Sequence, residues 1–376
     1  MMQFSIAAPI VGNAEARAVA RAVRESQISR GDSIEEFERN FAALMGGGEA
    51  VSVVTGTSAI EVAIRALGLA GEEVVTGAMS CQATANALLA ARCSIRFVDH
   101  DPATWQVSVE KAAQGITPKT RALVIAHLYG NAAEVSELAE LTRKRSIYLI
   151  EDCSQSLGAS SRGKLIGTFG TASTFSFYGN KLITTGEGGM LWTRDKKTAA
   201  QARLLRSFGQ DRPFHHVLFG LNWKMPNLLA ALGVEQLKRV PRLLAARRKR
   251  MQLLRRLLGS DPDILLPLLP PDLEPAPFCF PVVLPNHSAS EVQERLAEAG
   301  IETRPLFAPQ FDQPCWNSLF EQPSGEFPVA RYLAAHGLYL SVSPHLRMTD
   351  FVVIARELLR ILREPAAPKF QVEAYA

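Results

Sequence analysis

Short apolar runs alternate with segments of helical periodicity from about residue 51 to about residue 195. The runs have the length of buried strands, and they lie at 51–54, 74–76, 94–98, 122–126 and 146–152. A helical repeat begins after the first run, with apolar residues at Ile60, Ala63, Ile64 and Leu67. Two further helices are expected at 83–91 and 134–145. Strands that alternate with helices predict a mostly parallel sheet.

The second part of the chain changes character. A long helical stretch is predicted from about 226 to 258, and the segment 265–281 that follows is rich in proline. Each proline removes a backbone donor, so this segment is expected to be a linker or a wrapped loop. A smaller α/β unit would follow, with a strand at 278–284 and helices at 290–300 and 350–362.

These patterns predict two domains. The larger would cover residues 1–245 and the smaller would cover residues 246–376. The last segment, 364–376, contains two prolines and few large side chains, so we expect a mobile tail.

Composition excludes few function classes. The 376 residues are 47% hydrophobic and 21% charged, and a net charge of +4 is too small to indicate a nucleic-acid partner. The densest basic run comprises Arg247, Arg248, Lys249 and Arg250, followed by Arg255 and Arg256. Leucines interleave with it, so it is predicted to be the solvated face of an amphipathic helix, with no nucleic acid bound.

Cysteine usage indicates a reducing compartment. The five cysteines, at 81, 93, 153, 279 and 315, are odd in number and include no Cys-x-x-Cys pair. We therefore expect reduced thiols and a cytoplasmic protein. The first ten residues do not read as a secretion signal. No uninterrupted apolar stretch reaches about 18 residues, so no membrane association is expected.

The segment 174–190 contains the most informative chemistry. Lys181 stands between an aromatic and serine-containing approach and the glycine-rich sequence Gly-Glu-Gly-Gly. A lysine that forms a Schiff base needs such a setting, because its amine must be partly desolvated and glycines let a planar ligand approach the backbone. Ser176, five positions earlier, suits a phosphate contact. An ordinary loop lysine is the alternative.

Two other segments supply matching features. The turn Thr-Gly-Thr-Ser at 55–58 joins a strand to a helix and would present free amides to a phosphate, although Thr57 or Ser58 could instead cap its own helix. The strand at 146–152 ends in two carboxylates, and Gln155 follows Asp152 by three positions. A carboxylate at a strand end lies where α/β proteins bind ligands. A metal-binding aspartate is the weaker alternative, because no histidine shares the spacing.

The order of these motifs is similar to that of a known family. Gly-Thr-Ser-Ala, then Glu-Asp-x-x-Gln, then Ser-Phe-x-x-x-Lys resembles the nucleotide-sugar aminotransferases of the DegT/StrS group. Further matches lie at 128–130, 205–209, 220–225 and 302–305, so the resemblance extends from about residue 28 to 363. It implies the fold of a fold-type I transferase dependent on pyridoxal 5′-phosphate (PLP). That fold is α/β, with a mostly parallel sheet between helices in the large domain and a smaller C-terminal α/β domain.

The resemblance implies a role for each matching residue. Lys181 would carry PLP and, once released, would act as the base for proton transfer. Asp152 would pair with the ring nitrogen of PLP, and Gln155 would lie beside the ring. The phosphate contacts would be Thr57, Ser58 and Ser176.

Two further positions concern the subunit interface and the cofactor ring. Asn222 matches a residue that reaches the phosphate from a neighbouring subunit, which implies a homodimer with shared active sites. Cys81 occupies a position where the family usually has an aromatic residue stacked on the ring. A thiol offers less flat contact area, so cofactor affinity or substrate preference is expected to differ.

Substrate contacts are expected from three residues. His127 follows an apolar strand, Tyr178 lies in the lysine loop, and Arg304 precedes a proline in the match Thr-Arg-Pro. A structural histidine is an equal alternative for His127. The adjacent His215 and His216 would face opposite sides of a strand, so no metal site is expected there.

The resemblance implies an aminotransferase that moves an amino group from an amino acid, with glutamate expected, to a keto group of a nucleotide-linked deoxysugar. The motifs look closest to enzymes that make 4-amino-4,6-dideoxy sugars, such as perosamine synthases, which suggests C4. Three alternatives are a PLP-dependent sugar dehydratase, a lyase and a non-catalytic regulatory protein. The dehydratases replace the lysine with histidine, a desulfurase-type lyase needs a mobile catalytic cysteine, and Cys81 is the only residue that favours a regulatory protein.

Overall fold

A seven-stranded sheet forms the centre of the computed structural model, which describes residues 3–317 and 325–364. The strands lie in the order β1 (Glu49–Val53), β9 (Gly189–Thr193), β8 (Ala172–Ser176), β5 (Tyr148–Asp152), β4 (Thr120–Ala126), β2 (Glu73–Gly77) and β3 (Ser94–Val98). β9 runs antiparallel to both of its neighbours, and the other adjacent pairs are parallel. The predicted mostly parallel sheet is confirmed.

Helices α3 (Gly56–Ala66), α4 (Gln82–Ala90), α5 (Val109–Gly115) and α6 (Val135–Arg145) connect strands of this sheet, and α7 (Lys196–Leu205) follows β9. Apolar periodicity predicted α3, α4 and α6 but not α5 or α7. The predicted helices at 83–91 and 134–145 correspond to α4 and α6, with ends shifted by one residue.

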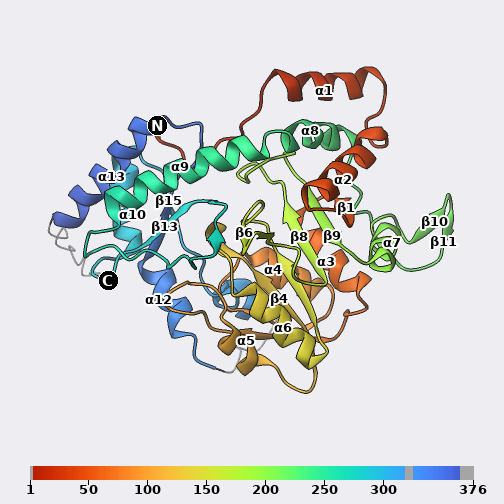
Figure 1. The fold of residues 1–376 in the computed structure, drawn as a ribbon, viewed down its shortest axis with the longest axis horizontal. Helices are drawn as coiled ribbons and strands as arrows, with labels where there is room; N and C mark the ends of the chain where they lie inside the picture. The colour runs from red at the N-terminus through yellow and green to blue at the C-terminus, as the bar shows by residue number, and fades with distance from the viewer. Residues whose placement is uncertain (1–2, 318–324, 365–376) are drawn as a thin grey trace, which may run out of the picture.

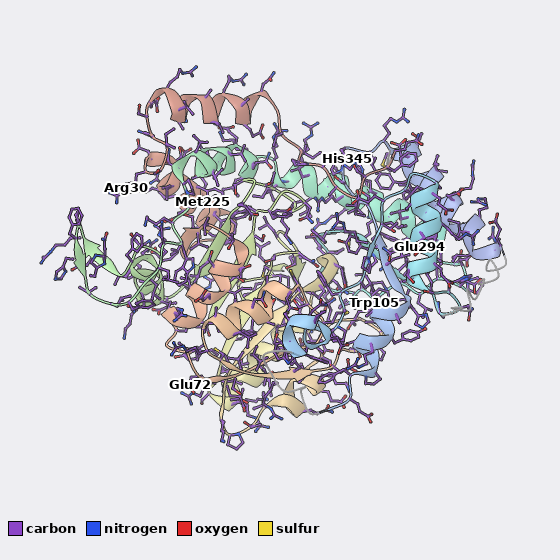
Figure 2. The ribbon with its side chains drawn as sticks, turned by 180° about the vertical axis from the view of Figure 1, so that it is seen from behind. Arg30, Glu72, Trp105, Met225, Glu294 and His345 are labelled. Carbon is purple, nitrogen blue, oxygen red and sulfur yellow. The ribbon has the colours of Figure 1, made fainter. Side chains whose placement is uncertain are left out.

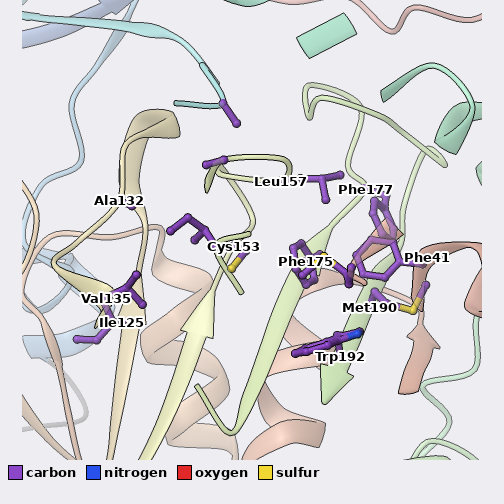
Figure 3. Close-up of a cluster of buried hydrophobic side chains, with 14 of the residues drawn as sticks. Phe41, Ile125, Ala132, Val135, Cys153, Leu157, Phe175, Phe177, Met190 and Trp192 are labelled. Atoms are coloured by element: carbon purple, nitrogen blue, oxygen red, sulfur yellow. The ribbon is translucent and has the colours of Figure 1, made fainter. Parts of the chain in front are cut away.

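Aromatic side chains fill the space between the sheet and the N-terminal helix α2 (Asp32–Leu44). The first helix, α1 (Asn13–Arg24), packs on α8 (Asn227–Leu237) instead, where Ala18 and Ala22 meet Ala231. Figure 3 shows Phe41 beside Phe175, Phe177 and Met190. Trp192 lies two residues after Met190 on β9. The Phe41 and Phe175 rings meet edge to face at 4.9 Å. Phe175 and Phe177 flank Ser176, so this packing fixes the strand end from which the lysine loop leaves.

The predicted helix at 226–258 is two helices, α8 (Asn227–Leu237) and α9 (Val240–Leu258). The prediction of one helix is wrong because Pro241 lies in the first turn of α9, where its missing amide is tolerated but a continuous helix is not. α9 is the long helix that runs from α8 to α13 (Met348–Arg363) in Figure 1. Its first turns contribute Leu243 and Leu244 to the core of the large sheet, and its last turns contribute Leu254 and Leu258 to a second core.

The second core surrounds a three-stranded antiparallel sheet with the order β13 (Phe280–Val283), β15 (Gly337–Leu340), β14 (Arg304–Pro305). α10 (Ala289–Glu298), α12 (Pro328–His336) and α13 are the helices of this part of the chain. Phe4 belongs to the same core and pairs with Ile301, so the start of the described chain packs on its C-terminal part. The domain boundary at 245/246 stays a prediction.

The remaining elements are short. They are β6 (Ser160–Ser161), β7 (Lys164–Leu165), β10 (Gln210–Arg212), β11 (His215–His216), β12 (Leu273–Glu274), α11 (Pro314–Asn317) and the 3-10 turns η1 (Leu128–Gly130) and η2 (Gln310–Asp312). The predicted proline-rich loop at 265–281 contains only β12 and the start of β13. The expected mobile tail falls outside the described residues from 365 onward. No helix among the described residues is long and apolar enough to cross a membrane.

Candidate active site

A cavity of about 310 Å³ opens beside the carboxyl ends of β4, β5 and β8 and the turn that follows β1. The predicted site residues that line it are Thr57, Cys81, His127, Asp152, Gln155, Ser176, Tyr178 and Lys181. These residues come from segments more than 100 positions apart, and parallel strands bring them to one edge of the sheet. Ser58, Asn222 and Arg304 do not line the cavity.

The turn between β1 and α3 forms one end of the cavity. Thr55 caps α3: its hydroxyl accepts a hydrogen bond from the amide of Ser58 at 3.1 Å, and the Ser58 hydroxyl donates back to the Thr55 carbonyl at 2.8 Å. Ser58 thus serves its own helix, which was the alternative stated for it. Gly56 and Thr57 line the cavity, and the first amides of a helix have no intrahelical partner.

Gly56 also controls how closely two segments approach. A Cβ at this position would lie 2.7 Å from the Cβ of Ser176, closer than real contacts allow. Glycine therefore lets the α3 N-terminus and Ser176 lie close together at one end of the cavity, where a phosphate could reach both.

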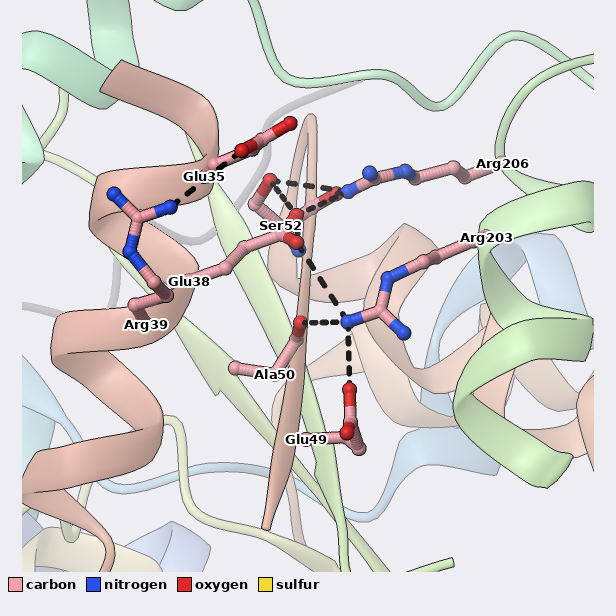
Figure 4. Close-up of polar contacts among 8 residues, drawn as sticks. All are labelled: Glu35, Glu38, Arg39, Glu49, Ala50, Ser52, Arg203 and Arg206. Atoms are coloured by element: carbon pink, nitrogen blue, oxygen red, sulfur yellow. Dashed lines mark hydrogen bonds and ion pairs between the residues drawn. The ribbon is translucent and has the colours of Figure 1, made fainter. Parts of the chain in front are cut away.

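A buried polar network holds β1 in place (Figure 4). Glu38 of α2 accepts hydrogen bonds from the Ser52 amide at 2.9 Å and the Ser52 hydroxyl at 2.7 Å. Arg206, at the end of α7, forms an ion pair with Glu38 and donates to the Ser52 carbonyl at 2.7 Å. Arg203 ties Ala50 and Glu49 to the same helix. The network joins β1 to α2 and α7, and so positions the turn that begins at Thr55.

Asp152 is 6% exposed and points into the cavity from the end of β5. One carboxylate oxygen accepts hydrogen bonds from the amide and hydroxyl of Ser154 at 3.1 and 2.6 Å. The other accepts from the Thr84 hydroxyl at 3.2 Å. Three donors thus fix the orientation of a carboxylate that remains open to a ligand. Gln155 is fixed in a similar way, because its Oε1 accepts from the Tyr129 amide at 2.7 Å.

Lys181 lies opposite Asp152, with its Nζ 4.8 Å from the centre of the Phe278 ring. Burial lowers the pKa of Lys181, and the charge of Arg247 lowers it further. Cys81, Asp152 and Cys279 act in the opposite direction. A lowered pKa raises the neutral fraction of the amine, which is the nucleophilic form.

His127 presents its ring to the cavity while both ring nitrogens bind protein groups. Nδ1 accepts from the Ala133 amide at 3.3 Å, so Nε2 carries the proton and donates to Glu151 at 3.2 Å. Glu151 is fully buried and accepts from the amides of Gly167, Phe169 and Gly170 as well. Both ring nitrogens of His127 thus have structural partners, as the structural alternative expects. A substrate contact would have to be made by the carbon atoms or the face of the ring.

His127, Glu151 and Cys153 also bring three potential metal ligands within 4.8 Å of one another. The Glu151 oxygens already accept hydrogen bonds from four N–H donors. These donors stabilise the carboxylate and leave little room for a metal ion beside it.

Of the other expected substrate and interface residues, Tyr178 reaches the cavity, whereas Arg304 and Asn222 lie apart from it. Tyr178 lines the cavity and is 52% exposed. Arg304 is exposed and pairs with Glu302 at 3.0 Å. Asn222 is exposed and forms a bridge with Ser207 outside the cavity.

Sequence reasoning missed several residues of the site. Ser80, Ser154, Glu187 and Phe307 also line the cavity, and no spacing rule identified them. Arg247 was predicted to be solvated, but it is only 4% exposed, so that prediction is wrong. The signal was present: Arg247 continues the buried stripe of Leu243 and Leu244 at helical spacing.

The residues present fit PLP. The cavity volume lies in the range of small-molecule sites. It combines a helix N-terminus and a serine for a phosphate, an oriented carboxylate for a ring nitrogen, and a lysine with a lowered pKa for an aldehyde.

Comparisons with known proteins agree with this fit. Residues 9–358 match the DegT/DnrJ/EryC1/StrS aminotransferase family. The chain is 34% identical over 338 residues to the GDP-perosamine synthase of Escherichia coli O157:H7, covering 88% of this chain and 90% of the relative.

Solved structures give the same result. An aminotransferase, TlmJ, from Streptoalloteichus hindustanus superposes with a TM-score of 0.90 at 28% identity, covering 96% of this chain and 100% of TlmJ. An E. coli GDP-4-keto-6-deoxy-D-mannose-3-dehydratase with bound hydrated PLP has a TM-score of 0.90 at 25% identity, covering 95% and 100%. The predicted fold, PLP cofactor and sugar aminotransferase activity are confirmed. The chain belongs to the DegT/DnrJ/EryC1/StrS aminotransferase family.

Proposed function

We propose that this enzyme transfers an amino group from glutamate to the C4 keto group of a GDP-linked deoxyhexose. The observation that carries the proposal is the meeting of Lys181 and Asp152 in one cavity beside a helix N-terminus. Similarity to a GDP-perosamine synthase supports the carrier and the carbon. A cytoplasmic location stays a prediction.

The cavity residues divide the chemistry among them. When bound, PLP supplies an electron sink that stabilises negative charge at the carbon being deprotonated. Asp152 holds a positive charge at the ring nitrogen. Gly56, Thr57 and Ser176 bind the phosphate. The amine of Lys181 holds the cofactor and, when free, removes and returns a proton at its Nζ, because a lowered pKa raises the fraction of the neutral, basic amine.

Lys181 favours amino transfer over the dehydratase alternative. The dehydratases of this fold have a histidine at the lysine position, whereas this chain has Lys181. A lyase of the desulfurase type would need a catalytic cysteine on a mobile loop. Cys81 is the one cysteine that lines the cavity among the described residues, and it directly precedes α4, which disfavours the lyase. Cys81 is also the only residue that favours a regulatory protein.

A homodimer is the second part of the proposal. Asn222 lies outside the cavity of its own chain, next to Lys224, whose pKa is lowered by partial burial and by the charges of Arg30 and Arg206. Figure 2 shows Arg30 and Met225 on the same side of the molecule. This basic region suits a phosphate held in a neighbouring subunit.

Large apolar side chains are also exposed on two other segments of the chain. Phe214 is 94% exposed and Phe219 is 78% exposed, on the segment around β10 and β11 that extends beyond α7 in Figure 1. Val11, Val23 and Ile28 are exposed near α1. Such exposure is typical of a surface that a partner covers.

The test combines the purified protein and PLP with glutamate and a GDP-linked 4-keto-6-deoxyhexose. Mass spectrometry should detect an aminated sugar nucleotide together with an equal amount of 2-oxoglutarate. A deoxygenated, nitrogen-free sugar would support the dehydratase, and no change in either compound would contradict the proposal. ¹⁵N-labelled glutamate identifies the origin of the nitrogen.

A further inference from the structure

Arg247 is a buried guanidinium in contact with the lysine loop. It lies on α9 and is 4% exposed. One terminal nitrogen, Nη2, donates to the carbonyl of Lys181 at 3.0 Å. The other, Nη1, lies 3.3 Å from the carbonyls of both Pro277 and Phe278.

These contacts connect the backbone of Lys181 with the backbone of Phe278, whose ring lies beside the lysine amine. The backbone of Lys181 is bound through its carbonyl, and the backbone of Phe278 is bound through its own. The ring of Phe278 lies 4.8 Å from Nζ of Lys181. The Arg247 side chain therefore fixes the distance between the loop that contains Lys181 and the Phe278 ring that its amine contacts.

The guanidinium has no carboxylate partner among residues 3–317 and 325–364. Its hydrogen bonds within the described part of the chain all go to carbonyl oxygens, and its Nε is buried there without a partner. Burial lowers the pKa of Arg247 to about 10, and the nearby Cys279 thiol opposes this. A buried cation without a counterion is costly, so its position indicates a use beyond stability.

Four groups from different elements act on the Lys181 amine. Arg247 of α9 disfavours its protonated form, while Cys81 before α4, Asp152 of β5 and Cys279 before β13 favour it. Arg247 is the one positive charge in this set.

We infer that Arg247 is a positioning residue for Lys181: its fork fixes the lysine loop against Phe278 and places a buried positive charge beside the lysine amine. The inference rests on the proposed role of Lys181 but concerns a residue that does not line the cavity of about 310 Å³. It predicts that removal of the Arg247 charge changes the protonation equilibrium of Lys181 while the fold is retained.

The test uses the full chain with PLP bound. The visible absorption of the PLP–lysine linkage is titrated with pH in the wild type and in Arg247→Met, Arg247→Gln and Arg247→Lys. Loss of the charge should raise the titration midpoint by about 0.5 to 1 pH unit, a threefold to tenfold change in the protonation equilibrium. Arg247→Gln keeps N–H donors without the charge and should shift similarly, whereas Arg247→Lys should stay closer to the wild type.

Arg250→Met is the matched control. Arg250 lies one turn further along α9, also donates only to carbonyls, those of Ala246, Pro344 and Leu346, and also has a buried Nε without a partner. It should reproduce the cost in thermal stability without moving the midpoint. Midpoints of the Arg247 variants equal to that of Arg250→Met would overturn the inference.

A second readout separates this inference from the cofactor assignment. Acetylation of Lys181 by acetic anhydride, followed by peptide mass spectrometry of the full chain without PLP, reports the neutral amine directly. Arg247→Met should be acetylated about threefold to tenfold more slowly at pH 7 than Arg250→Met. Equal rates would contradict the role of Arg247, whether or not the wild type shows a PLP band.

Discussion

At the scale of single residues, three polar groups that face the cavity are held in place by hydrogen bonds with neighbouring protein groups. Thr84 and Ser154 orient Asp152, the Tyr129 amide holds Gln155, and Glu151 fixes the proton on His127. Such support keeps a site in one geometry before a ligand binds, and this lowers the cost of binding.

Cys81 gives a direct prediction at this scale. Cys81→Tyr should restore a flat ring against the cofactor and tighten PLP binding by about twofold to tenfold, the effect of about 0.5 to 1.5 kcal/mol expected for ring stacking. PLP affinity would be measured by equilibrium dialysis. Cys81→Ser, which keeps the size and loses the polarisability, should bind PLP no more tightly than the wild type. Weaker binding by Cys81→Tyr would show that the cavity has no room for a ring there.

The spacing of motifs predicted Lys181, Asp152 and Gln155 in one cavity, because strand ends meet at one edge of a parallel sheet. It misplaced Arg247, because a run of basic residues was assumed to be solvated as a unit, although helical geometry turns one in four of them inward. The capping role of Ser58 also could not be decided from sequence, since the same hydroxyl suits a helix cap and a phosphate.

At the scale of elements, apolar periodicity predicted β1 to β5 of the large sheet and helices such as α3, α4 and α6. It missed α1, α2 and the strands β8 and β9, and its clearest error lies where local chemistry competes with it. Pro241 divided the predicted helix at 226–258, because the helical pattern continues across a break that only the proline marks. The short strands β6, β7 and β12 have too few residues to show any period.

The segment before α4 shows how an element depends on one buried side chain. His100 is 1% exposed, and its Nε2 accepts from the Met79 amide at 3.0 Å. Its Nδ1 then donates to the Trp105 carbonyl at 3.1 Å. The neutral ring thus holds the chain two residues before Cys81.

His100 predicts a loss of stability in acid. Burial lowers the pKa of His100 from 6.5 to about 4. Protons bind the unfolded chain first, so stability is full above about pH 6.5 and falls as the pH drops towards 4. The free energy of unfolding, measured with urea, should fall between pH 7 and pH 5 by about 2 kcal/mol more in the wild type than in His100→Gln. An equal fall in the two proteins would exclude His100 as the cause.

At the scale of the whole molecule, α9 links the two cores and carries Arg247 between them. Its N-terminal half packs against the core of the large sheet, and its C-terminal half packs against the core of the smaller sheet. The cavity is therefore sensitive to how the two parts of the chain are held together, which no local sequence pattern reveals. The proposed homodimer also could not be derived from periodicity, and it was expected only from the resemblance at Asn222.

Mixed subunits test the shared site. Lys181→Ala and Asn222→Ala should each be inactive alone, because each removes one contribution to every site. In a mixed dimer one site has both substitutions and the other has neither. Co-refolded equal amounts should therefore regain about a quarter of wild-type activity, the fraction of intact sites after random pairing. No recovery from confirmed mixed dimers would place Asn222 outside the neighbouring site.

The visible absorption spectrum of the purified protein with PLP, recorded before and after addition of glutamate, tests the central claim most directly. We expect a yellow band that bleaches with glutamate and is absent in Lys181→Ala. A band that persists unchanged in Lys181→Ala, or no band after incubation with PLP, would contradict the assignment of Lys181 as the cofactor lysine.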